Sequence, residues 1–426
     1  MSTCQNCNAL SGREQIAAAV STALETTPII DLHTHIYSAD FGELLLWGVD
    51  ELVTYHYLIA EVCRAPGGPS PAEFYAMTKT AQADRIWQHL FVESSPVSEA
   101  CRGVLTTLNA LGIDVNKPDL KAARDYFAST TVAAHIDRVL ELANVRAAVM
   151  TNDPFDPVER PVWLGEGCTD ARFLPALRID GVLIESMWAR NVASLQEWGY
   201  PVTPGLTQQA FRNVRKFLAD EIKRMSPLYM AVSLPDTFQF PGEDFTAQMI
   251  ANCVLPVARD TGTPFAMMIG VKRQLNPALK LAGDGVGRCD IRAVEQMAAD
   301  NPDIRFLCTL LSRENQHELC VAARKLPNLM PFGCWWFLND PLTIDEMTRM
   351  RLELLGLSMI PQHSDARILD QLIYKWKHSR AIFGKVLTDK YVDLAETGWR
   401  VTAEAIADDV ERLVARNFTD FVGRRV

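Results

Sequence analysis

The chain has 426 residues, of which 48% are hydrophobic and 22% are charged. This apolar content can build a large core and excludes a disordered protein, and the length fits one large α/β barrel with insertions or several smaller domains. Lys and Arg number 42 against 52 Asp and Glu, which gives a net charge of −10, and no basic run is longer than a pair. We therefore expect no nucleic-acid partner and no membrane partner.

The cysteines indicate a reducing compartment. The ten cysteines are scattered, and several lie inside apolar runs, such as Cys308 after Phe306 and Leu307. This distribution predicts buried thiols in a cytoplasmic protein rather than a disulfide framework. Cys4 and Cys7 form a single CxxC, but a zinc ribbon needs a second pair, so we favour a frayed N-terminus over a metal site there. The polar first ten residues and the absence of a long apolar run predict neither a signal peptide nor a membrane span.

Eight short apolar runs follow one another along the chain, at residues 28–35, 145–151, 172–179, 228–235, 264–271, 304–311, 329–336 and 355–362. Continuous rather than alternating apolarity is typical of strands that are covered on both faces. Helix-like stretches lie between the later runs, at residues 207–225, 245–261, 291–301, 315–326 and 343–355. Eight strands that alternate with helices predict an α/β fold, a (β/α)8 TIM-type barrel.

Two longer segments interrupt this alternation. Residues 37–144 separate the first run from the second, and we interpret them as a large helical insertion after strand 1, because the barrel pattern resumes afterwards. A smaller insertion covers residues 180–207. The predicted organisation is an N-terminal helix and first strand in residues 1–36, the helical insertion in 37–144, and the remainder of the barrel with one closing C-terminal helix in 145–426.

The first run ends in His33-Thr34-His35. Residues spaced i, i+2 on a strand point to the same face, so both imidazoles can reach one cation. An HxH pair that closes an apolar strand at the end where barrel active sites lie predicts metal binding. The alternative is a pair of solvent-facing histidines.

The eighth run is followed by His363-Ser364-Asp365-Ala366-Arg367. In a closed barrel the last strand lies beside the first, so Asp365 can complete a metal-binding set with His33 and His35 and leave positions open for water or substrate. The alternative is that Asp365 caps the following helix.

Several other strand ends supply cations, namely Arg178, Lys272, Arg273, Arg313 and Arg367. In an acidic protein such a set indicates a focused anion site rather than solvated surface charges. The planar guanidinium group matches a carboxylate bidentately, which favours a carboxylate-bearing substrate. Trp335 and Trp336, at the end of the seventh run, can form a flat wall for a sugar ring, and barrel packing is the competing interpretation.

With these motifs the sequence resembles the uronate isomerase (glucuronate isomerase) family, a divergent branch of the metal-dependent amidohydrolase superfamily. The resemblance spans nearly the whole chain in order. It is carried by residues 28–35, 41–47, Tyr55-His56-Tyr57, Thr151-Asn152-Asp153-Pro154, Arg178, Gly283-Asp284-Gly285, 332–337, Asn339-Asp340 and Ser364-Asp365-Ala366-Arg367. The double tryptophan and the Asp-x-Arg motif at ordered positions make it specific.

The resemblance implies an isomerase that interconverts aldohexuronates and ketohexuronates, of the D-glucuronate to D-fructuronate type. It implies one divalent metal ion, expected to be zinc, on His33, His35 and Asp365. Arg178 and Arg367 would bind substrate oxygens, including the carboxylate. The resemblance also implies that His56 and Tyr57 reach the site from the helical insertion. Moving the carbonyl from C1 to C2 needs one base near both carbons, for which Asp365 and Tyr57 are the candidates. We further expect a homo-oligomer.

The chain departs from the family after the fifth run, where Met267-Met268-Ile269-Gly270 replaces a His-Ile-Gly context. A thioether cannot replace an imidazole as a base. One alternative is therefore that this protein is a relative that acts on a different acid sugar, with Lys272 or Arg273 in new contacts to it. Two further alternatives are a mononuclear hydrolase or decarboxylase of the same superfamily, acting on a carboxylate-bearing sugar or lactone, and a non-catalytic acid-sugar binder.

Overall fold

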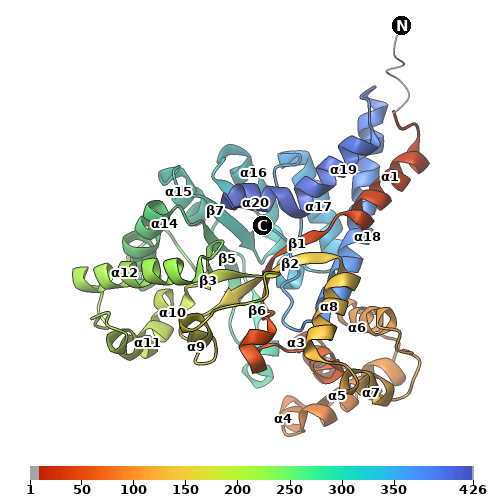
Figure 1. The fold of residues 1–426 in the computed structure, drawn as a ribbon, viewed down its shortest axis with the longest axis horizontal. Coiled ribbons are helices and arrows are strands. Elements are labelled where there is room, and N and C mark those ends of the chain that lie inside the picture. The colour runs from red at the N-terminus through yellow and green to blue at the C-terminus, as the bar shows by residue number, and fades with distance from the viewer. Residues whose placement is uncertain (1–8, 425–426) are drawn as a thin grey trace.

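The computed structural model of the chain describes residues 9–424 and has an inner sheet surrounded by helices (Figure 1). Seven parallel strands pair in the order β1-β2-β3-β4-β5-β7-β8, and the short β6 pairs antiparallel with β5. The strands are β1 (Ile29–Thr34), β2 (Val145–Asn152), β3 (Phe173–Arg178), β4 (Met230–Pro235), β5 (Phe265–Lys272), β6 (Gly285–Val286), β7 (Phe306–Leu310) and β8 (Leu329–Pro331). Seven of the eight predicted runs are thus confirmed as barrel strands.

The eighth run, residues 355–362, is not a regular strand, so this part of the prediction was wrong. Only Ile360 forms a bridge there, to Phe332. Pro361 has no N–H to donate to a ladder, and Asp365 has a φ of 51°, a left-handed conformation that strands do not adopt. Backbone hydrogen bonds nevertheless join this segment to both neighbours, from Gly333 N to Ile360 O at 2.9 Å and from Asp365 N to His33 O at 3.2 Å. The segment therefore closes an α/β TIM-type barrel.

Helices on the outside bury the two-sided apolar strands. The barrel helices and the helices at the chain ends are α1 (Arg13–Thr26), α9 (Glu159–Leu164), α10 (Asp180–Leu183), α11 (Glu185–Glu197), α12 (Gln208–Met225), α13 (Phe245–Met249), α14 (Leu255–Thr261), α15 (Arg292–Asp300), α16 (Gln316–Lys325), α17 (Pro341–Leu355), α18 (Gln371–Glu396), α19 (Ala403–Glu411) and α20 (Asn417–Val422). The predicted helices at 207–225, 291–301, 315–326 and 343–355 are confirmed. That at 245–261 is interrupted by the π-helical turn η3 (Ile250–Val254).

Between β1 and β2 the chain is helical, as expected for residues 37–144. These helices are α2 (Val49–Val53), α3 (His56–Arg64), α4 (Pro71–Tyr75), α5 (Lys79–Trp87), α6 (Glu99–Ala110), α7 (Lys121–Ala128) and α8 (Val132–Ala143). The 3-10 and π turns in the rest of the chain are η1 (Ala39–Leu44), η2 (Gln88–Val92), η4 (Pro277–Gly283), η5 (Arg313–Asn315), η6 (Trp336–Leu338) and η7 (Arg412–Arg416). Figure 1 shows α3 to α8 gathered on one side of the barrel.

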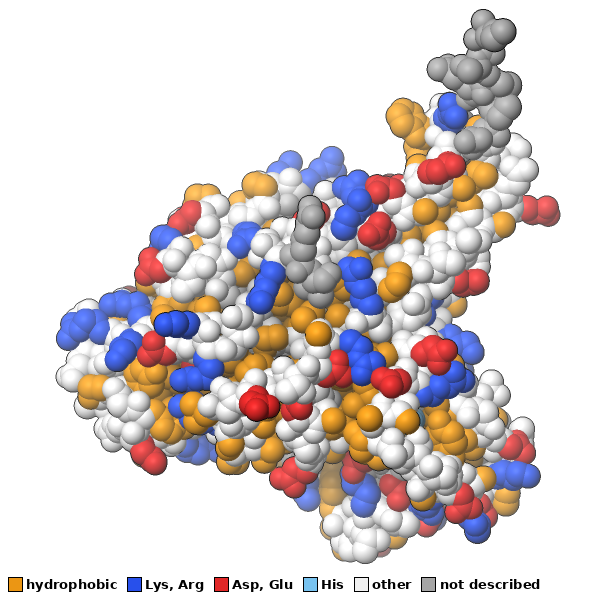
Figure 2. All heavy atoms as spheres, viewed as in Figure 1, with side chains coloured by type: hydrophobic (Ala, Val, Ile, Leu, Met, Phe, Trp, Pro, Cys, Tyr) orange, Lys and Arg blue, Asp and Glu red, His pale blue; other side chains and the backbone are white. Residues whose placement is uncertain are grey.

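The C-terminal segment forms α19, η7 and α20 in direct succession, which agrees with the predicted closing helix up to residue 424. Cys4 and Cys7 lie outside the described residues. All eight cysteines within those residues are free thiols. No helix in residues 9–424 has the length and apolarity to cross a bilayer. On the face seen in Figure 2, acidic and basic side chains are interspersed.

Packing inside the barrel fixes the end at which a substrate can bind. Side chains from successive strands, such as Leu32, Val149, Ala231 and Leu307, fill the barrel axis and are fully or almost fully buried. A TIM barrel is therefore solid along its axis, and its reactive groups lie at the carboxyl ends of the strands.

The start of α17 is capped as the Asn339-Asp340-Pro341 sequence suggests. The Asp340 carboxylate accepts hydrogen bonds from the backbone N–H groups of Leu342 and Thr343, at 3.0 and 3.1 Å. We expect Asp340→Ala to lower the free energy of unfolding by about 1 kcal/mol, because these N–H groups lose their acceptor. Asp125→Ala is the control, since it removes only an exposed ion pair with Lys121, and we expect less than about 0.5 kcal/mol there. Urea unfolding of both variants measures the difference, and equal losses would contradict the cap.

Candidate active site

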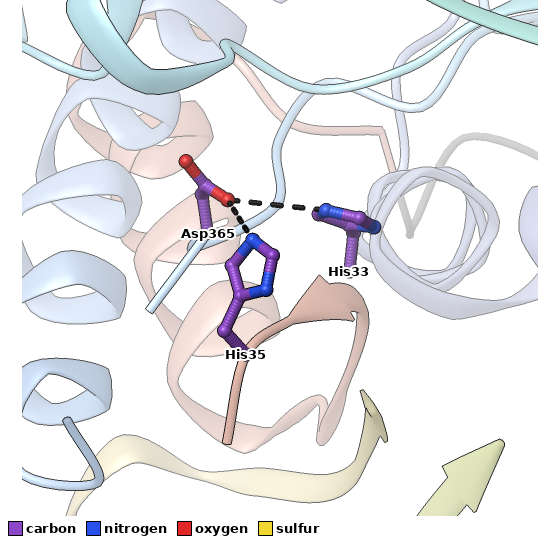
Figure 3. Close-up of side chains that lie close together, drawn as sticks. All are labelled: His33, His35 and Asp365. Carbon is purple, nitrogen blue, oxygen red and sulfur yellow. Dashed lines mark ion pairs between the residues drawn. The ribbon is translucent and has the colours of Figure 1, made fainter. Parts of the chain in front are cut away.

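Strand β1 and the eighth segment bring three ligand-type side chains together. His33 lies in β1, His35 follows the last residue of this strand, and Asp365 approaches both from the eighth segment (Figure 3). The Asp365 Oδ1 atom lies 3.4 Å from His35 Nε2 and 3.9 Å from His33 Nε2. One ligand atom from each residue lies within 4.8 Å of the other two. The predicted His33, His35 and Asp365 set is therefore assembled in space.

The backbone around Asp365 is held by the first strand. Asp31 is completely buried, and its carboxylate accepts hydrogen bonds from Ser364 N at 3.0 Å and from Trp376 Nε1 at 2.8 Å. His35 N donates to Ala366 O at 2.7 Å. These bonds hold Asp365 in its left-handed conformation, which aspartate tolerates better than most residues.

The alternative role for Asp365, a helix cap, is not adopted. Helix α18 begins at Gln371, and Asp370 occupies its N-cap position. The Asp365 Oδ1 atom is buried and has no hydrogen-bond donor among the described residues. A carboxylate oxygen left without a donor in this way is suited to a cation rather than to a backbone N–H.

The hydrogen bonds of Tyr229 define the tautomer of His33. The Tyr229 hydroxyl lies 2.7 Å from Leu32 O and donates its only proton to that carbonyl. His33 Nδ1 lies 3.1 Å from the same hydroxyl oxygen and must therefore be the protonated, donating nitrogen. His33 Nε2 is left with a lone pair, is buried, and has no hydrogen-bond partner in residues 9–424. This is the tautomer that a metal ligand needs.

Burial keeps the imidazoles neutral. It lowers the pKa of His33 to about 3, with a smaller contribution from His35. Burial likewise holds the pKa of His35 well below its usual value, and the positive charge of Arg367 acts in the same direction. Two neutral imidazoles and one carboxylate with an open side fit a divalent metal such as zinc. The donor set therefore passes the test for a metal site.

A cavity lies at this end of the barrel. It is lined by His35, Tyr55, His56, Arg178, Ser233, Met268, Arg273, Trp335, Trp336, Asp365 and Arg367. The structure thus brings most of the predicted catalytic and substrate-binding residues to one place. Trp335 and Trp336 are both buried there and also pack on each other, with ring centroids 6.1 Å apart.

Four predicted residues do not line this cavity. Arg313 is exposed and pairs with Glu346 at 2.8 Å, so its assignment to the anion site was wrong and it is a surface charge. His33 lies next to the cavity in the ligand set. Tyr57 is half-buried among aromatic rings, and its hydroxyl is buried and unpaired in the described part of the chain.

Lys272 is the fourth of these residues. It is half exposed and lies 3.7 Å from Asp236. In a regular strand Met268 and Lys272 would point to the same face. The pairing of β4 with β5 shifts its register between Ile269 and Val271, at Gly270, so the alternation is broken before Lys272.

Sequence reasoning missed two lining residues, Tyr55 and Ser233. Ser233 lies near the end of β4, in the run at 228–235, and its strand-end position was the available signal. Its N–H donates to Asp180 Oδ1 at 3.4 Å. The same carboxylate holds Arg178 Nε at 3.0 Å, so Asp180 fixes Ser233 and Arg178 on one wall.

The three guanidinium groups of the cavity differ in their partners. Arg178 is paired with Asp180, and this charge raises the pKa of Arg178 above its usual value. Arg273 is paired with Asp284 at 2.5 Å. The side chain of Arg367 has no hydrogen bond or ion pair to any residue within 9–424. Arg367 therefore retains its full donor capacity for an oxygen-rich ligand.

Fold and site together define an α/β TIM-type barrel that carries, at the carboxyl ends of its strands, one three-residue group suited to a single metal ion. The chain is similar to the crystal structure of a uronate isomerase from Bacillus halodurans C-125, at 53% sequence identity with a TM-score of 0.95, over 98% of each chain. At this identity over nearly the whole length, the chain belongs to the uronate isomerase family.

Two more distant structures share the fold. A uronate isomerase from Thermotoga maritima has a TM-score of 0.76 at 15% identity, over 97% of this chain and 99% of that one. A glucuronate isomerase from Caulobacter crescentus has a TM-score of 0.78 at 14% identity, over 100% and 98%. No protein-family model matches the chain. No curated protein matches it either.

Proposed function

We propose that the protein interconverts aldohexuronates and ketohexuronates, in the manner of D-glucuronate and D-fructuronate. The observation that carries this proposal is the cavity in which Asp365, with an unpaired buried oxygen, lies beside three guanidinium groups. The guanidinium groups suit an acid sugar, and the carboxylate suits proton transfer. The uronate isomerase from Bacillus halodurans supports the same reaction class.

The reaction moves a carbonyl from C1 to C2 through an ene-diol. A base removes the proton from C2 and the proton is returned to C1, while the proton of the C2 hydroxyl is transferred to the C1 oxygen, so no atom is gained or lost. Asp365 is the proposed base, because it lines the cavity and its second carboxylate oxygen, Oδ2, is not the one that faces His33 and His35. Burial raises the pKa of Tyr57 well above its usual value, so this phenol stays protonated and is suited to donate a hydrogen bond rather than to act as the base.

His33, His35 and Asp365 are the proposed ligands of one divalent metal ion, and zinc fits their chemistry. When bound, the ion supplies a positive charge that holds substrate oxygens and stabilises developing negative charge. Arg178 and Arg367 are the proposed contacts to other substrate oxygens, with Arg273 and Trp335 on adjoining walls. Lys272 does not line the cavity, and we expect it to contribute only to the positive electrostatic potential around the substrate.

Incubation of the protein with D-glucuronate and with D-galacturonate in deuterated water tests the proposal. We expect a ketose to form and solvent deuterium to enter the sugar at the exchanged position. A hydrolysed or decarboxylated product would instead support the alternative within the superfamily. If no hexuronate of a panel reacts and no metal is found by emission spectroscopy, the non-catalytic sugar binder is the better account.

The cytoplasmic location and the homo-oligomer stay predictions. The free thiols of the described residues support a reducing compartment. Size-exclusion chromatography with light scattering measures the oligomeric state, and a monomer would contradict the second prediction.

A further inference from the structure

Lys375 is a buried lysine that the proposed reaction does not use. It lies on α18, the helix that follows the Asp365 segment, and only 4% of its surface is exposed. Within residues 9–424 its ammonium group has no hydrogen bond and no ion pair. Withdrawing a charge from water without a partner is costly, and a methionine would fill the same space without that cost. The lysine therefore needs an explanation other than packing.

Ion pairing does not explain the lysine either. Three carboxylates are near enough for their charge to act on the ammonium group, namely Asp365, Glu99 and Asp31, but each has other partners. Glu99 lies 2.6 Å from His378 Nδ1 and 2.7 Å from a guanidinium nitrogen of Arg102. Asp31 accepts the two hydrogen bonds described above, and Asp365 faces the histidines of the ligand set.

Two tyrosine rings hold the ammonium group instead. Lys375 Nζ lies over the rings of Tyr57 and Tyr374, at 5.8 Å from each centroid. The face of an aromatic ring is negative and attracts a cation, more strongly where water is excluded. Burial lowers the pKa of Lys375 below its usual value, and the charges of the three carboxylates oppose this shift. The rings and the carboxylates together favour the charged form.

Tyr57 and His56 connect this charge to the cavity. Their ring centroids are 4.6 Å apart, and His56 lines the cavity. Arg178 and Arg273 reach the cavity from the end of β3 and from the loop after β5, whereas Lys375 comes from α18, behind Tyr57. Within a protein interior a fixed charge acts over several side chains, because it is screened much less than at the surface.

We propose that the buried ammonium group of Lys375 is a fixed positive charge that stabilises the negative charge on the substrate oxygens when the C2 proton is removed. Lys375 does not line the cavity, so it is a positioning residue that acts through its field and through the Tyr57 ring. A charge that is already in place needs no reorganisation as the reaction proceeds. The inference rests on the proposed isomerase activity.

Lys375→Met tests the proposal, because it removes the charge and keeps the length of the side chain. For the hexuronate that wild-type protein converts best, we expect kcat to fall about tenfold and KM to change less than about twofold. In metal-free protein the midpoint of thermal unfolding should rise by about 2 °C, because an apolar group replaces a buried charge. Zinc affinity, measured against a competing chelator, should rise by about tenfold, because a positive charge near Asp365 is lost.

Lys280→Met is the matched control. Lys280 Nζ also lies over a tyrosine ring, 4.0 Å from the centroid of Tyr75, but Lys280 is exposed and does not line the cavity. We expect kcat and zinc affinity to stay within about twofold of wild type, and thermal stability not to rise. Lys375→Arg keeps the charge and should retain more of kcat than Lys375→Met does.

The opposite signs of the two effects distinguish an electrostatic role from a structural one. A lysine needed only for packing would lose kcat and thermal stability together, in Lys375→Met and in Lys375→Arg alike, and this result would overturn the proposal. So would an unchanged kcat in Lys375→Met beside normal turnover by wild-type protein, which leaves the proposed function intact. If wild-type protein converts no hexuronate, the proposed function fails, and the role of Lys375 in it fails as well.

Discussion

Asp365→Asn is expected to lower kcat for hexuronate isomerisation by about 10²–10⁴-fold, the usual contribution of a positioned general base. The substitution keeps the size of the side chain and replaces the proposed base with an amide that cannot take the C2 proton. The substitution also removes the charged member of the proposed metal-binding set. The other two members, His35 and His33, have their Nε2 atoms 3.4 and 3.9 Å from Asp365 Oδ1. Ketose formation and bound metal per protomer should therefore both decrease.

The variant should fold normally. Asparagine accepts a left-handed φ such as the 51° of residue 365 about as readily as aspartate. Asp236→Asn is the control, because Asp236 follows β4 directly and does not line the cavity. Within residues 9–424 its only ion pair is with Lys272, at 3.7 Å. We expect its kcat to stay within about twofold of wild type. Normal turnover by Asp365→Asn would remove Asp365 from the role of base and direct attention to another group of the cavity.

The ligand set could be predicted because it depends on local periodicity and on barrel closure. The spacing of His33 and His35 predicts that both side chains point to the same side at the end of β1, and closure of the barrel brings the chain after the last run to that side. Neither inference needs knowledge of side-chain packing. The eighth run was predicted as a strand from its apolar residues, but Pro361 and the left-handed Asp365 prevent a regular ladder.

The remaining features depend on contacts between segments far apart in the sequence. Asp31 and Trp376 are 345 residues apart and meet only after the barrel closes. In the sequence Tyr229 is one more residue of an apolar run. Its effect on the His33 tautomer follows only from the contacts of its hydroxyl with Leu32 O and His33 Nδ1. Trp336 was interpreted as a flat wall because the sequence does not reveal its φ or its stacking partner.

Tyr229→Phe is expected to weaken metal binding by about 10–100-fold, although Tyr229 is not a ligand. Its hydroxyl oxygen is the acceptor that keeps the proton of His33 on Nδ1, at 3.1 Å, and thereby leaves Nε2 free. Without that acceptor the imidazole can move its proton to Nε2 or rotate, and both changes remove the lone pair from the ligand set. Titration of metal-free protein with zinc against a competing chelator measures the loss.

Tyr391→Phe separates this effect from a general loss of stability. Tyr391 is also buried, and its hydroxyl donates to Asp409 at 2.9 Å between α18 and α19, away from the cavity. Each substitution removes one tyrosine hydroxyl from a buried hydrogen-bonded position, so both should lower the free energy of unfolding by about 0.5–1.5 kcal/mol. Only Tyr229→Phe should change zinc affinity. Equal affinity in both variants would contradict the tautomer assignment, because the hydroxyl would then contribute to folding but not to the orientation of His33.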